Sequence, residues 1–130
     1  MARDKFFQRL PDAATADATR ALEAYCTQAT GLLAYVTDKK HELRVRMRPR
    51  GRVVLTALYL TRFKEFHGRA YCLPQTIVEM GIPASRVIVP EREDEPLRSK
   101  FRLTADEYVK HLQAIALAAA ASFRSEHGSA

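Results

Sequence analysis

The chain has 130 residues, of which 47% are hydrophobic, and it carries a formal net charge of +6 at pH 7. The composition is that of an ordinary globular protein, and the length suits one domain that buries roughly two-thirds of its unfolded surface. The amino terminus has no signal-peptide core, and no apolar run approaches the ~18 residues of a membrane span. We therefore expect one cytoplasmic domain over residues 1–130, without membrane contact and with frayed ends at 1–10 and 125–130.

The first predicted elements are a helix and a strand. Pro11 and Asp12 open an Ala-rich segment in which apolar residues recur at helical spacing, which indicates a helix over residues 12–29. Gly31 then precedes a short apolar run, residues 32–36, that is typical of a strand. This strand should end at the polar turn that follows.

The next two runs predict a β-hairpin that is rich in arginine. Residues 42–48 alternate between apolar and basic side chains, and residues 52–61 are apolar on both faces, as in an interior strand. The sequence Pro49-Arg50-Gly51 joins them and is typical of a turn. The apolar residues of 53–66 also fit the helical period, so a helix remains the alternative for that segment.

The region after Gly68 changes in character. We expect a short helix over residues 74–80 that Gly81 ends, a buried strand over 86–89, and a polar loop over 91–100. Residues 75–87 also resemble the helix-turn-helix pattern, with a glycine in the turn. The β-branched run at its end and the following proline disfavour a second helix there.

The last predicted element is a long helix that begins with a capping box. Thr104 and Glu107 have the spacing at which each side chain bonds to the backbone of the other residue. An apolar stripe continues from there to about Phe123. The order of elements predicts a small two-layer α+β domain: a mostly antiparallel sheet with the basic β-hairpin, packed against the N-terminal helix and the long C-terminal helix.

The positive charge is concentrated on the hairpin. Ten of the 31 residues from Lys39 to Arg69 are Lys or Arg and two are acidic, whereas the other 99 residues have a net charge of −2. Because side chains alternate across a strand, Arg44, Arg46 and Arg48 should share the face opposite the helices, roughly 6.5–7 Å apart. An arginine row of this kind can follow a phosphate backbone, since the guanidinium group pairs with phosphate through two hydrogen bonds.

The charge pattern favours a non-enzymatic module that binds nucleic acid through its phosphate backbone. A protein-interaction or inhibitor module that docks the same basic face on an acidic protein partner is the alternative. Tyr35, Tyr59 or Tyr71 would supply a ring on which a base could stack. The predicted anion-binding residues, all basic and all in or next to the hairpin, are Arg44, Arg46, Arg48, Arg50, Arg52, Arg62, Lys64 and Arg69.

Several other interpretations compete with binding of an external partner. The arginine face could be solvated, or paired within the molecule to the acidic run at 91–95. Asp38, Glu42 and Arg44 faintly resemble the site of a metal-dependent nuclease. The spacing of histidines and cysteines matches no zinc or redox site, so we expect no catalytic residue, no cofactor and no metal.

Two further expectations concern the apolar residues. Cys26 and Cys72 should be free buried thiols, although a cation beside Cys72 would lower its pKa. Leu112, Ile115 and Phe123 should belong to the core, with the seam of a homodimer as the alternative.

Overall fold

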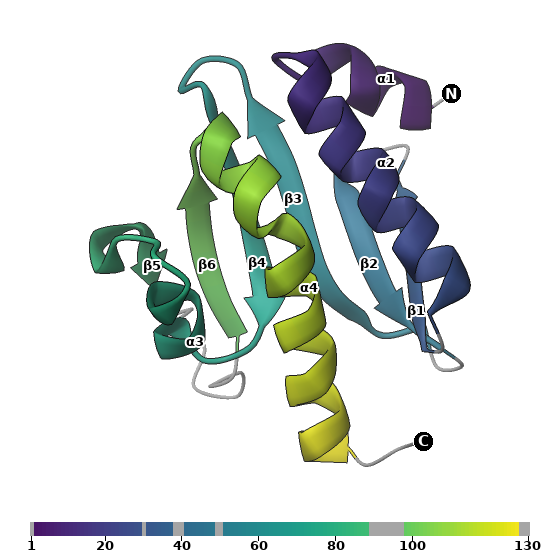
Figure 1. Cartoon of the computed structure of the whole chain (residues 1–130), viewed down its shortest axis with the longest axis vertical. Coiled ribbons are helices and arrows are strands. Elements are labelled where there is room, and N and C mark those ends of the chain that lie inside the picture. The colour runs from purple at the N-terminus through teal and green to yellow at the C-terminus, as the bar shows by residue number, and fades with distance from the viewer. Residues whose placement is uncertain (1, 30, 38–40, 49–50, 89–97, 128–130) are drawn as a thin grey trace.

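A computed structural model of the chain describes residues 2–29, 31–37, 41–48, 51–88 and 98–127. It shows the expected α+β fold: one antiparallel sheet whose strands lie in the order β1-β2-β3-β4-β6-β5, with α2 and α4 packed on one face (Figure 1). The strands are β1 (Leu32–Val36), β2 (Leu43–Met47), β3 (Val53–Leu60), β4 (Glu65–Tyr71), β5 (Val87–Ile88) and β6 (Arg98–Leu103). The helices are α1 (Ala2–Arg9), α2 (Ala13–Gln28), α3 (Pro74–Glu79) and α4 (Ala105–His127), with a short 3-10 helix at Ala84–Arg86.

Side-chain hydrogen bonds fix the start of both long helices. Asp12 caps α2 by accepting from the backbone N–H of Thr15 at 2.8 Å. The predicted capping box begins α4: the backbone N–H of Glu107 donates to the Thr104 hydroxyl at 3.2 Å, and the backbone N–H of Thr104 donates to Glu107 at 2.9 Å. Each bond satisfies a backbone donor that the first helical turn leaves without a partner.

The core lies between the helices and one face of the sheet. On β2, Leu43 and Val45 are fully buried because the alternation of the strand turns them toward the helices. The ring of Phe66 on β4 stacks on Tyr108 of α4, with centroids 3.7 Å apart. The Tyr108 hydroxyl shares a 2.5 Å hydrogen bond with Thr19 of α2, so one buried side chain joins both helices and the sheet.

Gly68 allows β3 and β4 to approach unusually closely. A Cβ atom at this position would lie 2.0 Å from the carbonyl oxygen of Thr56 and 2.7 Å from the ring of Phe101. The phenyl ring of the neighbouring strand therefore occupies the space that a side chain would need. Glycine is the residue that permits this packing inside a strand.

Most of the predicted elements are confirmed. The strand 32–36, the two hairpin strands and the long C-terminal helix all form, and β3 shows that the helical alternative for 53–66 is wrong. The helix-turn-helix alternative is also wrong, because α3 is followed by a 3-10 turn and a strand instead of a second helix. Of the strand predicted at 86–89, Val87–Ile88 forms β5, whereas Arg86 belongs to the 3-10 helix. The prediction that this strand is buried is wrong for Ile88, which is exposed because β5 lies at the edge of the sheet.

Three expectations about irregular regions are wrong. Residues 2–9 form α1 and bury Phe6 against the core, and α4 continues through His127, so neither predicted frayed end is fully irregular. Residues 65–71, for which the sequence predicts no strand, form β4. The predicted loop 91–100 ends in β6 from Arg98 onward. Gly68 in β4 and the basic residues of β6 made the apolar pattern of these two strands hard to recognise in the sequence.

Both cysteines are free and buried, as the sequence predicts. Burial raises the pKa of each thiol to about 11, so the lowered pKa considered for Cys72 is wrong. Leu112, Ile115 and Phe123 are buried in the core, so they are not available as a dimer seam. Within the described ranges, no helix is long and apolar enough to cross a membrane.

The close approach at Gly68 predicts an unequal response of two glycines to alanine. Gly68→Ala should lower the free energy of unfolding by about 3 kcal/mol, because the new methyl group collides with the backbone of β3. Gly81→Ala should cost about 1 kcal/mol, since φ at Gly81 is +110° but its surroundings are open. Urea denaturation of both variants measures the difference. Equal losses would contradict the close packing.

Candidate functional site

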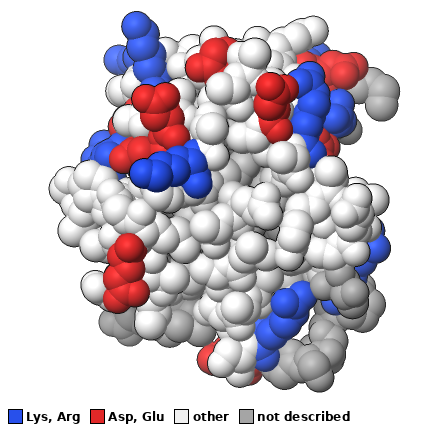
Figure 2. Space-filling view, viewed as in Figure 1, with Lys and Arg blue, Asp and Glu red and all other residues white. Residues whose placement is uncertain are grey.

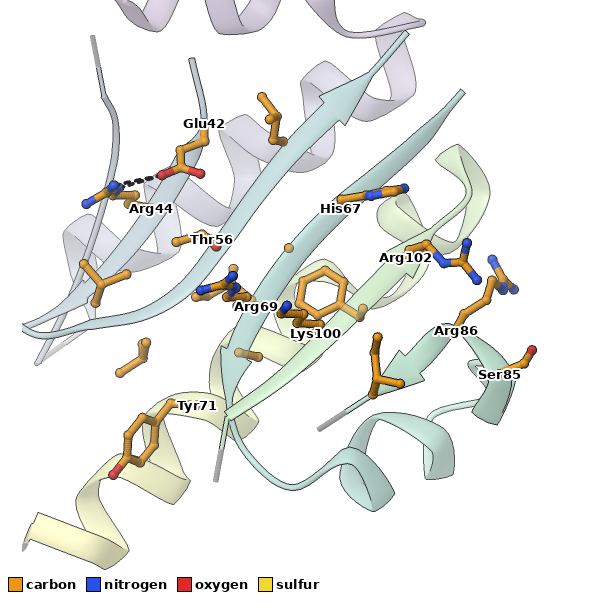
Figure 3. Close-up of a pocket in the computed structure, with 18 residues that line it drawn as sticks. Glu42, Arg44, Thr56, His67, Arg69, Tyr71, Ser85, Arg86, Lys100 and Arg102 are labelled. Atoms are coloured by element: carbon orange, nitrogen blue, oxygen red, sulfur yellow. Dashed lines mark hydrogen bonds and ion pairs between the residues drawn. The ribbon is translucent and has the colours of Figure 1, made fainter. Parts of the chain in front are cut away.

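The sheet face opposite α2 and α4 carries a hollow of about 720 Å³ (Figure 3). Side chains from β2, β3, β4 and β6 line it, and residues of the 3-10 helix and β5 close one side. The charged side chains and the histidine that line it are mostly basic. They are Glu42, Arg44, His67, Arg69, Arg86, Lys100 and Arg102.

Strand register aligns several of these side chains across the sheet. Arg44 is the partner of Thr56, Thr56 is the partner of Arg69, and Arg69 is the partner of Lys100. Three strand spacings of about 4.8 Å separate the backbone positions of Arg44 and Lys100 by about 14 Å. In a neighbouring set of residues paired across the strands, His67 of β4 is the partner of Leu58 on β3 and of Arg102 on β6. The cationic row therefore crosses the strands, whereas the sequence predicted a row along β2.

Three neighbouring cations in this hollow lack acidic partners in the described part of the chain. Arg69 and Arg102 are exposed, and Lys100 is half-buried between them on the paired strands. No ion pair joins any of the three to a described carboxylate. Like charges held this close repel one another, so an anion that enters the hollow is attracted by all three.

Two arginines at opposite sides of the hollow are held by carboxylates. The Arg44 guanidinium lies 2.9 Å from Glu42. Partial burial lowers the pKa of Arg44, but the hydrogen bonds and charge of Glu42 and Tyr35 outweigh this effect and raise it. Arg86 donates two hydrogen bonds of 2.5 Å to the carboxylate of Glu107, which belongs to the capping box of α4. Figure 3 shows both arginines at the rim, with Lys100 and Arg69 between them.

The arginines nearest the hairpin turn serve the hairpin itself or lie outside the hollow. Arg46 donates to the Tyr35 hydroxyl at 2.5 Å and to the carbonyl of Gly51, and its guanidinium lies 4.8 Å from the centre of the Tyr35 ring. Arg48 and Arg52 are exposed and do not line the hollow.

Of the eight predicted binding residues, Arg44 and Arg69 line the hollow. Arg62 and Lys64 lie in the exposed turn between β3 and β4, and Arg50 lies outside the described residues. Sequence reasoning missed Lys100, Arg102 and Arg86. The run Arg98-Ser99-Lys100-Phe101-Arg102-Leu103 has a basic side chain at every second position, as β2 does, and that signal would have identified the second basic strand.

The three tyrosines expected to stack with a base all make contacts within the molecule. Tyr59 is buried, and the guanidinium of Arg46 lies over Tyr35. Tyr71 packs edge-on against Phe123, and its hydroxyl lies 3.0 Å from His127.

The nuclease hypothesis has no support in the described geometry. Glu42 is engaged by Arg44, and Asp38 lies outside the described residues. No cluster of three or more His, Cys, Asp or Glu side chains in the described ranges has the arrangement of a metal site. The acidic run at 91–95 also lies outside the described residues, so internal neutralisation of the arginines stays a prediction.

The helix-covered side of the molecule differs in charge from the hollow. Figure 2 shows that its centre, over α2 and α4, is largely uncharged, and that Lys, Arg, Asp and Glu are intermingled near its edges.

Comparison of the chain with family models, with curated proteins and with solved structures finds no significant match in any of the three. The site must therefore be interpreted from its own geometry.

The Arg86–Glu107 pair predicts a specific dependence of stability on pH. Partial burial raises the pKa of Glu107, but the hydrogen bonds and charge of Arg86, with bonds from Thr104, outweigh burial and hold the pKa below its ordinary value of 4.5. The ionised carboxylate therefore stabilises the fold fully above about pH 5, and this contribution is lost as pH falls through the lowered pKa.

Glu107→Gln should lower the free energy of unfolding by about 1.5 kcal/mol at pH 7, and the difference from the unsubstituted protein should shrink toward pH 3. Denaturant unfolding at several pH values measures both effects. Asp106→Asn, at an exposed neighbouring acid that forms no ion pair in the described part of the chain, is the control. An equal pH response in the two variants would show that the pair contributes no pH-dependent stability.

Proposed function

We propose that this protein is a non-enzymatic nucleic-acid-binding module that holds the phosphate backbone in the hollow of its sheet. The observation that supports the proposal best is the cluster of Arg69, Lys100 and Arg102, which come from two paired strands and have no acidic partner among the described residues. Such a cluster is costly to keep without an anion, because it concentrates like charge on one surface. Binding of a polyanion removes that cost.

The shape of the basic surface favours a chain of phosphates over a single anion. The row from Arg44 to Lys100 extends over about 14 Å, which is longer than one phosphate group. The hydroxyl group of Thr56, between Arg44 and Arg69, adds a neutral donor of the kind that contacts phosphate oxygens. Backbone contacts of this type position a nucleic acid without reading its sequence.

The proposal predicts that affinity depends on these cations specifically. The variant R69A/K100A/R102A should bind oligonucleotides more weakly and reduce the slope of log affinity against log salt by about 2, since each phosphate contact with a single strand contributes roughly 0.7. Fluorescence anisotropy with short single-stranded and double-stranded DNA and RNA, at low and near-physiological salt, measures both quantities. The thermal midpoint of this variant should not fall, because the three side chains face away from the core and their removal relieves repulsion between like charges.

The matched control removes three exposed positive charges from the helix layer. K5A/R9A/K110A changes the net charge equally but leaves the hollow intact, so its affinity and salt slope should stay close to those of the unsubstituted protein. Equal weakening of both variants would show that net charge alone causes binding. Absence of binding to every oligonucleotide at low salt would overturn the proposal and favour an acidic protein as the partner of the same face.

A further inference from the structure

The tip of the β3–β4 hairpin presents an aromatic ring to solvent. Phe63 is 56% exposed, although a phenyl ring gains free energy when it is removed from water. It lies in a four-residue turn between β3 and β4, and Leu60 and Glu65 are the last paired residues before this turn. Lys64 in the same turn has φ of +55°, a conformation that non-glycine residues adopt rarely. The turn thus places an exposed ring at the end of the sheet.

This ring is continuous with the basic hollow. It stacks on the imidazole of His67, with centroids 6.0 Å apart and planes inclined by 15°. His67 itself lines the hollow and is paired with Arg102 on β6. Figure 3 shows His67 and Arg102 on neighbouring strands at the end of the hollow that is remote from Tyr71. Phe63 and His67 therefore extend the cationic surface with two nearly parallel rings.

We infer that Phe63 and His67 form a stacking platform for a nucleobase, and that the ligand of the hollow is consequently a single-stranded nucleic acid. This inference rests on the function proposed above. A paired duplex keeps its base faces within its own stack, whereas a single strand can place a base on a protein ring while its phosphates lie in a basic groove. Arg102, next to His67, would hold the phosphate that precedes or follows that base.

The chemistry of this end of the hollow suits a base better than another phosphate. The carboxylate of Glu65 lies 3.6 Å from Nε2 of His67, and a carboxylate repels a phosphate. The guanidinium of Arg62 lies 5.5 Å from the centre of the Phe63 ring. Arg46 over Tyr35 is held by two hydrogen bonds, whereas exposed Arg62 has no hydrogen bond or ion pair to another described residue, so it can leave the Phe63 ring and cover the π-face of a base. The ring face, the imidazole and the guanidinium are three groups on which bases stack.

The test compares oligonucleotides that have bases with strands of the same length that lack them. Phe63→Ala should weaken binding of a single-stranded DNA or RNA by roughly tenfold, because one base–aromatic contact is lost. The same substitution should leave the affinity for an abasic deoxyribose-phosphate strand unchanged, since that strand has no base to stack. Fluorescence anisotropy gives both affinities, and the unsubstituted protein should bind single strands more tightly than duplexes of equal length.

Two variants make the readout specific to the ring. Phe63→Trp keeps an aromatic surface and should retain tight binding, whereas Tyr25→Ala removes an exposed aromatic ring from the helix layer and should have no effect. If Phe63→Ala weakens abasic and base-bearing strands equally, or if duplexes bind as tightly as single strands, the inference is overturned while the proposed function stands. If no strand of any kind binds at low salt, both proposals are overturned.

Discussion

The burial of one sheet face beneath α2 and α4 is the constraint on which the rest of the structure depends. The helices cover one face, so alternate residues of β2, β4 and β6, and of β3 from Leu55 onward, face the core. Phe66, Tyr108 and Thr19 join the sheet to both helices through a ring stack and a buried hydrogen bond. The remaining residues of the same strands are then collected on the opposite face, where the basic hollow lies.

This arrangement assigns different roles to cations that look alike in the sequence. Arg46 and Arg44 are two residues apart on β2, yet Arg46 is bonded to the hairpin and Arg44 lines the hollow. Arg86 is far from both in the sequence and reaches the hollow because Glu107 holds it from the first turn of α4. Some arginines thus stabilise the fold, as Arg46 does in the hairpin, whereas others line the hollow, as Arg44 and Arg86 do.

The ion pairs within the site also limit how much of its charge is available. Arg44 and Arg86 each have a carboxylate partner, so an incoming phosphate must share these two guanidinium groups. Arg69, Lys100 and Arg102 have no such competitor among the described residues. The central cations should therefore dominate the attraction for an anion, and the paired arginines at the rim should define its edges.

The sequence by itself determined the local features: the α+β class, the hairpin strands, the capping box of α4 and the alternation that turns Arg44 away from the core. Each follows from residues within a few positions of one another, where periodicity and capping act directly. Only the tertiary structure decided that Arg69 lies beside Lys100, and that Phe63 adjoins the hollow through His67. Those neighbours depend on strand register and on the antiparallel pairing of β4 with β6, across about 30 residues of chain, and no local pattern encodes that pairing.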